Sequence, residues 1–308
     1  MKSEPSNHLK RINKELGIER IVELLTERIP GSDLSTLLLQ VFQEKTKKLD
    51  PGELLKRYQT NRVVQPVSID LIKLRQMELD VLKIASNHFF TPVQLSPVAP
   101  LGSCSVVAAV NQNKVLSTIR GTEVVSDATN LLALHISDML KSGKKSNRED
   151  YIRFCTTHRH VRTQFFNKPG MLPHFHLFCM VTSGRDIGSY HFERQSFWEH
   201  ISIYRDIFQS LFQSDIEVIL SGRGGYQDPE GMLRRVVQHG ERFSIQVSIK
   251  EPNLENQYYK GLQFTVITKI NGEEHNIGDG GFVDWSQKLL ASKKERLIIS
   301  AIGLDRLC

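Results

Sequence analysis

Two arginines stand where a strand-like run meets a loop. Residues 157–178 read THRHVRTQFFNKPGMLPHFHLF, two apolar-rich runs around a turn that contains Pro and Gly. Arg159 and Arg162 lie at the end of the first run. A guanidinium can hold a phosphate through two parallel hydrogen bonds. The spacing therefore predicts a hairpin whose arginines bind a polyphosphate beside the loop.

The same hairpin carries four histidines that suggest a different chemistry. His158 and His160 alternate on the first run, and His174 and His176 alternate on the second. Residues two apart face the same side of a strand, so pairing could bring four imidazoles onto one face and bind zinc or another transition metal. No acidic residue lies close in the sequence to orient the rings. A metal-binding protein is therefore kept as an alternative.

Two further stretches offer polar groups after an apolar run. In STIRGTEVVSD, Thr122 and Glu123 follow Gly121 and could present a hydroxyl and a carboxylate to a ligand ammonium. The same stretch equally predicts a strand that leads through an S-D-A-T cap into a helix. In IGLDRLC, we expect a strand, a turn at Gly303 and a helix whose first turn presents Arg306 to a planar base or a phosphate.

Composition sets broad limits on the class of protein. The 308 residues include 40 basic and 34 acidic ones, interspersed along the chain, for a net charge of +6. Four scattered cysteines form no C-x-x-C pair, the first residues lack an apolar signal region, and no apolar run spans a bilayer. We therefore expect a cytoplasmic protein without a membrane partner. SGRGGYQDPEG lacks the spacing of a phosphate-binding P-loop.

The elements needed to position these residues follow from periodicity. Residues 1–64 read as a helical N-terminal module, with no chemistry of its own, that could contact a partner protein. Residues 65–308 read as one core that begins with a long amphipathic helix over 68–90. A hairpin is expected over 103–120, and several adjacent strands follow. The order predicts an α+β fold with an antiparallel sheet flanked by helices, not a doubly wound parallel sheet.

Taken in order, three stretches resemble the motifs of the class II aminoacyl-tRNA synthetase catalytic core. TPVQLSP resembles motif 1, HRHVR motif 2 and AIGLDRL motif 3. The resemblance implies a homodimer formed through the motif 1 region and ATP bound with Mg²⁺. It matches Arg159 to the arginine that grips the α-phosphate and Arg306 to the arginine over ATP, with Arg162 as a helper on the loop.

Within the class, residues 68–308 resemble histidyl-tRNA synthetase and its paralogue, the regulatory subunit of ATP phosphoribosyltransferase. QYYKGLQFTV is similar to that family's D-Y-Y-T-G strand, and IGDGGFVDWSQKL is similar to its G-G-R-Y-D turn. IRGTE resembles its P-E-G-T segment. The resemblance implies that Tyr258 and Tyr259 wall an amino-acid pocket and that Gly280 and Gly281 let the backbone approach the ligand.

The chain departs from this family where adenylation needs polar groups. Hydrophobic or mismatched residues replace family residues at five positions: Arg120, Val161, Leu177, Val181 and Leu254. Because motif 3 stands at the end of the sequence, we also expect no anticodon-binding domain. We therefore expect a divergent paralogue that binds a nucleotide, an amino acid or both, without normal tRNA charging, as a regulator or a specialised ligase. An alternative is ATP-dependent adenylation of a non-histidine acid. The sequence assigns no catalytic residue, and tRNA is not an expected partner.

Overall fold

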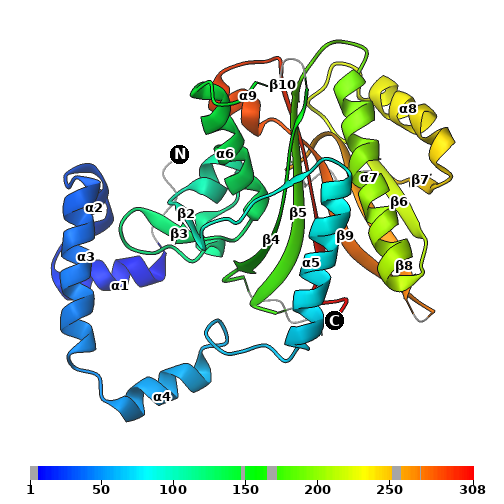
Figure 1. Ribbon diagram of the computed structural model, residues 1–308. Helices are drawn as coiled ribbons and strands as arrows, with labels where there is room; N and C mark the ends of the chain where they lie inside the picture. Colours follow the sequence, from blue (N-terminus) through cyan, green and yellow to red (C-terminus); the bar gives the residue numbers. More distant parts are fainter. Residues whose placement is uncertain (1–5, 147–149, 165–171, 252–257, 271) are drawn as a thin grey trace.

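The main element of the protein is a twisted eight-stranded sheet with helices on both faces (Figure 1). The computed structural model describes residues 6–146, 150–164, 172–251, 258–270 and 272–308. In sheet order the strands are β1 (Thr91–Pro92), β4 (Ile152–Val161), β5 (His174–Arg185), β10 (Glu295–Gly303), β9 (Glu273–Val283), β8 (Lys260–Ile270), β6 (Ile216–Gly222) and β7 (Gln246–Ile249). All neighbours are antiparallel except β1 with β4 and β6 with β7. The predicted α+β class and antiparallel sheet are confirmed.

One face of the sheet packs against three long helices. These are α5 (Leu71–Asn87), α7 (His191–Phe212) and α8 (Pro229–Gly240). Cys155, Phe178, Ile298 and Phe264 point from the strands into this layer. Burying such side chains stabilises the fold by about 1.5–3 kcal/mol each. We call this side the α5 face.

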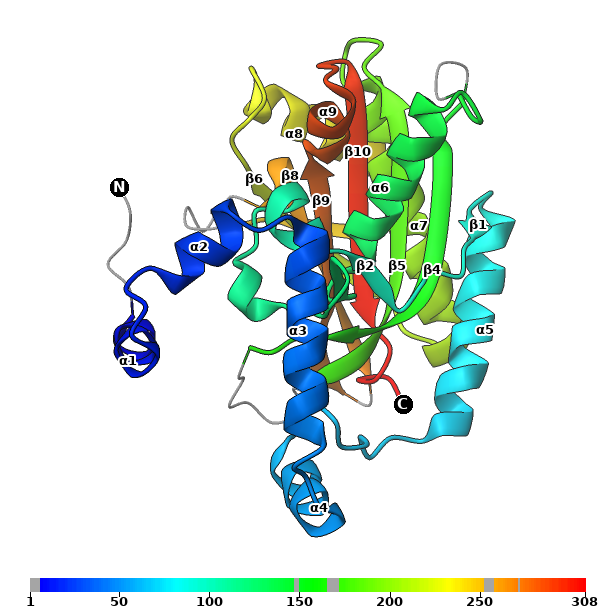
Figure 2. The same cartoon turned by 90° about the vertical axis from the view of Figure 1, so that its left-hand side faces the viewer.

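The opposite face carries the shorter elements and is called the α6 face. It packs against α6 (Ala128–Lys141) and α9 (Trp285–Leu290). Phe154, Val181 and Ile299 point from the strands into this second core. They alternate with the residues that point to the α5 face, so each central strand is buried on both sides. Figure 2 shows α6 lying in front of the central strands.

The hairpin expected over 103–120 is wrong. Residues Ser103–Val107 form one irregular turn (η1) and Gln112–Lys114 another (η2). The strands form instead on either side of this stretch, as β2 (Val98–Pro100) paired with β3 (Thr122–Val124). The reason lies in Glu123, whose buried carboxylate accepts the amide hydrogens of Gly102 and Cys104. Those amides are therefore unavailable to a strand ladder.

The four helices of the N-terminal module extend away from the sheet (Figures 1 and 2). They are α1 (Asn7–Leu16), α2 (Ile21–Glu27), α3 (Gly31–Thr46) and α4 (Pro51–Thr60), and none of them contains a buried residue. On α3, five large apolar side chains are exposed: Leu37, Leu38, Leu39, Val41 and Phe42. The helical character is confirmed, and the domain boundary at residue 64 stays a prediction.

The segment after α4 attaches this module to the β4–β5 hairpin. Arg62 donates from Nη2 to the carbonyl of Gln164 at 2.8 Å, and the His174 imidazole Nε2 lies 2.7 Å from the Gln65 carbonyl oxygen. Across the described residues, every helix is too short or too polar to cross a lipid bilayer.

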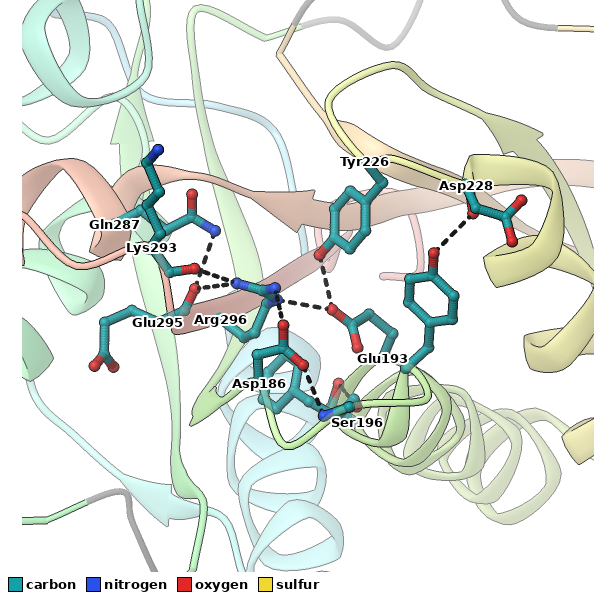
Figure 3. A network of polar contacts seen from close by, with 12 residues as sticks. Asp186, Glu193, Ser196, Tyr226, Asp228, Gln287, Lys293, Glu295 and Arg296 are labelled. Atoms are coloured by element: carbon teal, nitrogen blue, oxygen red, sulfur yellow. Dashed lines mark hydrogen bonds and ion pairs between the residues drawn. The ribbon is translucent and has the colours of Figure 1, made fainter.

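A polar network fixes the end of the sheet where β10 begins (Figure 3). Arg296 donates from Nε to Glu193 at 3.0 Å and from Nη2 to Asp186 at 2.5 Å. The Tyr226 hydroxyl also donates to Glu193, at 3.0 Å. Burial raises the pKa of Glu193. The network ties α7 to β10 at this end of the sheet, whereas the site described below lies toward the other end of the strands.

Gly280 tests the packing of the central sheet. A Cβ there would lie 2.4 Å from Phe264 Cζ and 2.6 Å from the Ile299 carbonyl oxygen. We expect Gly280→Ala to lower the free energy of unfolding by about 1–3 kcal/mol, because the backbone oxygen cannot yield. Gly222→Ala is the matched control, since a Cβ there meets nothing within 4 Å. Urea denaturation measures both, and equal losses would contradict the packing described.

Candidate ligand-binding site

A cavity of about 780 Å³ lies on the α6 face of the sheet. It is bounded by the β4–β5 hairpin, the start of α6, the strands β8, β9 and β10, and the C-terminal turn. Among the described residues, three cations line it: Lys114, Arg162 and Arg306. Three carboxylates of the same described part line it as well: Asp127, Asp279 and Asp305. A cavity of this size with a few polar groups can hold a small metabolite.

Arg162 is one of the predicted phosphate ligands, and it lines the cavity. Its guanidinium donates from Nε to the Ser126 carbonyl at 3.1 Å and lies 5.2 Å from the centre of the Phe175 ring. A cation over a ring face is attracted by the electron density of the ring. Phe175 itself lines the cavity, so the ring and the guanidinium form one edge of it.

Arg159 lies on the other side of the sheet. In the β4–β5 pairing Arg159 is opposite His176, and His158 is opposite Leu177. The Arg159 guanidinium donates from Nη2 to His174 Nδ1 at 2.6 Å. His176 in turn lies 3.2 Å from the Glu78 carboxylate on α5. Arg159 therefore points to the α5 face and does not line the cavity, contrary to the alignment that matched it to the α-phosphate arginine.

The same pairing corrects the metal hypothesis. His158 and His160 are on the α6 face, and His174 and His176 are on the α5 face, because their positions in the ladder differ by one residue. The prediction that four imidazoles share one face of the hairpin is therefore wrong. In the described part of the chain, no cluster of three or more His, Cys, Asp or Glu side chains is suited to a metal ion.

His160 instead positions the start of α6. Its Nε2 accepts the amide hydrogen of Ala128 at 2.8 Å, so the ring must be neutral with the proton on Nδ1. Complete burial lowers the pKa of His160 to about 3, which keeps the acceptor available at neutral pH. This bond fixes the first turn of α6 against β4, and with it the adjacent Asp127.

Asp127 connects α6 to the predicted tyrosines. As the N-cap of α6 it accepts the amide hydrogen of Thr129 at 2.9 Å, and it also accepts the Tyr258 hydroxyl at 2.6 Å. Burial alone would raise the pKa of Asp127, but the charge of Arg162 and the bonds from Thr129 and Tyr258 outweigh it and lower the pKa. Asp127 is therefore an ionised, fully engaged carboxylate.

Asp279 is the second carboxylate that the sequence did not single out. It is on β9, in the G-D-G-G stretch, and it is hydrogen-bonded to Tyr259. Desolvation of its carboxylate by the surrounding protein is the main cause that raises the pKa of Asp279, and the negative charge of Asp127 raises this pKa further. Alternation along β9 puts Asp279 on the same face as Gly281, but Ile277 packs into the α5-face core because the β8–β9 register shifts beside it, so the sequence pattern did not indicate this face. Tyr258 and Tyr259 both line the cavity; that they wall an amino-acid pocket stays a prediction.

The predicted glycines act through packing. A Cβ on Gly281 would lie 2.7 Å from Tyr259 Cδ1 and 2.5 Å from the Leu262 carbonyl oxygen. Gly281 thus lets the Tyr259 ring lie against the strand, while Gly280 makes room for Phe264 on the α5 face. Neither glycine lines the cavity. Tyr259, at the start of β8, therefore requires a glycine beside it near the end of β9.

Thr122 and Glu123 lie away from the cavity lining. Thr122 donates its hydroxyl to the Ile119 carbonyl, and the Glu123 carboxylate accepts three hydrogen bonds, from Gly102, Cys104 and Gln112. Glu123 thus holds the loop that brings Cys104 to the cavity wall. The neighbouring Ser126 and Asn130 contact the Cys104 sulfur, whose pKa burial raises to about 11.

Arg306 lines the cavity from the C-terminal turn. The expected helix after Gly303 is absent, because residues 304–306 form a turn. The exposed Arg306 donates from Nη1 to the Asn276 carbonyl at 3.2 Å. The adjacent Asp305 accepts the amide hydrogen of His176 at 2.8 Å and so ties this turn to β5.

The positions that depart from the family fall into several environments. Leu177 lines the cavity, and Val181 is fully buried in the α6-face core. Val161 is opposite His174 on the α5 face. Arg120 is exposed and has a left-handed backbone, with φ of 66°. Leu254 lies outside the described residues.

The arrangement is similar to known synthetase structures. A threonyl-tRNA synthetase structure from Cryptosporidium parvum, titled its RNA-binding domain, matches with a TM-score of 0.62 at 9% identity over 80% of this chain and 64% of that one. Apo histidyl-tRNA synthetase of S. aureus matches with a TM-score of 0.58 at 12% identity, over 76% and 64%. An ATP phosphoribosyltransferase regulatory subunit/histidyl-tRNA synthetase from Bacillus halodurans gives 0.58 at 11%, over 79% and 80%.

These likenesses establish the fold. The chain has the architecture of a class II aminoacyl-tRNA synthetase core, as the three motifs predicted. It spans about 64% of the length of the threonyl- and histidyl-tRNA synthetases named above. No protein-family model and no curated protein sequence matches the chain.

Asp127→Asn tests the electrostatics of the site. Asparagine also caps helices, so the change chiefly removes the charge. At pH 7 we expect a loss of about 1–3 kcal/mol in the free energy of unfolding. The pKa of Asp127 is lowered on folding. The ionised carboxylate therefore stabilises the folded state at pH values above its ordinary pKa of 3.8, and this stabilisation is lost as the pH falls through the pKa of the folded state.

In urea denaturation, the difference in the free energy of unfolding between wild type and Asp127→Asn should therefore become smaller as the pH is lowered from 7 toward 3. Asp50→Asn is the matched control, an exposed N-cap at the start of α4. A loss at Asp127 that does not change with pH, or an equal loss at Asp50, would contradict the assignment.

Proposed function

We propose that this chain is a divergent class II synthetase-like protein that binds a nucleotide, an amino acid or both in the α6-face cavity. It acts as a regulator or a specialised ligase and does not charge tRNA in the normal way. The observation that carries the proposal is the cavity itself, in which Arg162, Arg306, two tyrosines and three aspartates line one space of about 780 Å³.

The charges in the cavity suit a ligand with groups of both signs. Arg162 and Lys114 lie on the hairpin side, and Arg306 lies at the C-terminal turn. These cations support the expectation of a phosphate or carboxylate group. The exposed guanidinium of Arg306 supports a planar group such as a base.

ATP with Mg²⁺ is the nucleotide form that we propose. The described residues offer no ready cluster of metal ligands, so Mg²⁺ would enter with the phosphates. The residues of this chain would hold the nucleotide through Arg162 and Arg306, both of which line the cavity.

Efficient adenylation is less well supported. Arg159, which the alignment matched to the α-phosphate, is bonded to His174 on the opposite face. Leu177 gives the cavity an apolar side chain where the family has a polar one. A single donor aimed at developing charge typically contributes about 3–4 kcal/mol to lowering a reaction barrier. A binding or regulatory role is therefore preferred.

Partner contact is a second part of the proposal. We propose a homodimer, with the N-terminal module available to a further protein. The exposed apolar residues of α3 support contact between the N-terminal module and another protein. The four helices of this module have no buried residue, so they gain little stability from packing within the chain. Light scattering of the full chain should give twice the chain mass of 35.2 kDa, and a monomeric mass would contradict the dimer.

Thermal-shift binding against ATP, ADP and the twenty amino acids, with Mg²⁺ present, tests the ligand. A ligand at 100 times its Kd should stabilise the protein by about 2.7 kcal/mol. We expect Arg162→Ala to weaken binding of any anionic ligand at least about tenfold, a change of roughly 1.4 kcal/mol. Arg159→Ala is the control, because its side chain lies on the α5 face.

A ligand that needs Arg159 but not Arg162 would overturn the site. Failure of every compound to shift the transition would overturn the ligand-binding function. If a ligand binds, ATP–pyrophosphate exchange separates the two roles, because a specialised ligase supports exchange with its acid and a regulator does not.

A further inference from the structure

A second cavity, of about 310 Å³, lies between α7, the end of α5 and the turn that follows α8. That turn is η3 (Glu241–Phe243), which continues directly from α8. Figure 1 shows α7 and α8 side by side. The two cavities share no lining residue, and α7 packs on the α5 face of the sheet. We call this space the α7–α8 cavity, and three of the side chains that line it are Ser202, Arg205 and Arg242.

A stack of aromatic rings orders one wall of the α7–α8 cavity. The Phe243 ring lies nearly parallel to the Trp198 indole, with centroids 5.0 Å apart. The Trp198 Nε1 donates to the Val236 carbonyl at 2.8 Å, which anchors the stack to α8. The Arg242 guanidinium lies 4.8 Å from the centre of the Phe243 ring. Arg242 is exposed but held by this contact, so it has less side-chain freedom to lose when it binds a ligand.

Two carboxylates beside this cavity are already paired. Glu199 accepts hydrogen bonds from Arg153 Nε at 2.9 Å and from Arg153 Nη2 at 3.0 Å. Asp206 accepts a hydrogen bond from Arg205 Nε at 3.1 Å and lies 2.7 Å from His88 Nε2. Carboxylates engaged in this way can neutralise little further positive charge.

Positive charge is left over on the α8 side of the cavity. Within the residues that the structure describes, neither Arg242 nor Arg194 forms an ion pair with Asp or Glu, and the buried Nε of Arg194 has no hydrogen-bond partner. Partial burial lowers the pKa of His239, and the positive charges of Arg242 and Arg194 lower it further. The α7–α8 cavity therefore has a local excess of positive charge.

Ser202 adds a donor that the protein itself does not use. Its side chain is on α7, lines the cavity and is 8% exposed. In the described part of the chain its hydroxyl has no hydrogen-bond partner, whereas Ser196 on the same helix donates to the Phe192 carbonyl at 2.7 Å. A largely buried hydroxyl without a partner lowers stability. An oxygen of a ligand in the cavity would accept this hydrogen bond.

His239 is a neutral ring at the same wall. Arg242 Nη2 lies 2.6 Å from His239 Nε2. A guanidinium can only donate, so Nε2 accepts and the proton of the ring is on Nδ1. The cavity is thus lined by two guanidinium groups, a hydroxyl and an imidazole that carries a donor hydrogen.

We propose that the α7–α8 cavity is a second binding site, for a small oxyanion of the phosphate type held by Arg242, Arg205 and Ser202. A phosphate group accepts several hydrogen bonds at once, and guanidinium groups bind it through paired donors. The anion is either free phosphate or the phosphate group of a small metabolite, because both present the same oxygens. The site goes beyond the proposed function and does not depend on it, because it lies on the α5 face, away from the α6-face cavity.

Titration calorimetry of the full chain at pH 7 tests this inference, with inorganic phosphate and glycerol 3-phosphate as probes and glycerol as the uncharged control. We expect Arg242→Gln to weaken phosphate binding at least about tenfold, as the loss of a charged hydrogen bond implies. Ser202→Ala should weaken it about threefold or more. The same change should leave the melting temperature of the free protein unchanged or higher, because this hydroxyl has no partner to lose.

Arg235→Gln is the matched control, since Arg235 is on α8, lies 5.4 Å from the centre of the Tyr190 ring and does not line the cavity. Arg162→Ala is the second control, because Arg162 lines the α6-face cavity. Neither change should alter phosphate affinity. Tighter binding of inorganic phosphate would identify the free ion as the ligand, and tighter binding of glycerol 3-phosphate would identify a phosphorylated metabolite. Either preference supports the site.

Phosphate binding that is lost in Arg162→Ala and retained in Arg242→Gln would overturn the inference, because the anion would then lie in the α6-face cavity. Unchanged affinity in both Arg242→Gln and Ser202→Ala would overturn it as well. Failure of both phosphate probes to bind wild type would also overturn it and would leave the proposed function, which concerns the other cavity, standing.

Discussion

The alternation of side chains along the β4–β5 hairpin is the constraint on which the rest of the site depends. Register pairs Arg159 with His176 and His160 with Phe175, and successive residues point to opposite faces. Arg162 and Phe175 therefore meet in the cavity, while Arg159, His174 and His176 face α5. A shift of one residue would exchange the two sets, but both faces are packed, so the buried cores hold the register.

From that register the rest of the cavity follows. His160 accepts the first amide of α6 and places Asp127, which receives the Tyr258 hydroxyl. Tyr259 lies against Gly281, where a side chain would collide with the ring, and bonds to Asp279. The result is a pair of carboxylates on one wall of the cavity, each bonded to its own tyrosine and each within the influence of the charge of Arg162.

Much of the fold was predictable, because helical periodicity and apolar strands report local structure directly. The helices of residues 1–64, the long helix before β1 and the central hairpin all follow from such patterns, and motif order identified the class II core. The loop over 103–120 did not follow, since Glu123 takes backbone amides that a strand would use. Asp279 could not be recognised without the sheet, because its importance comes from neighbours on β8, β10 and α6 rather than from its own segment.

A crystal structure of the protein with the ligand that stabilises it most would show directly whether the α6-face cavity is the binding site. We expect the ligand on the α6 face, with its acidic group toward Arg162. A ligand bound on the α5 face against Arg159 would contradict the proposed site.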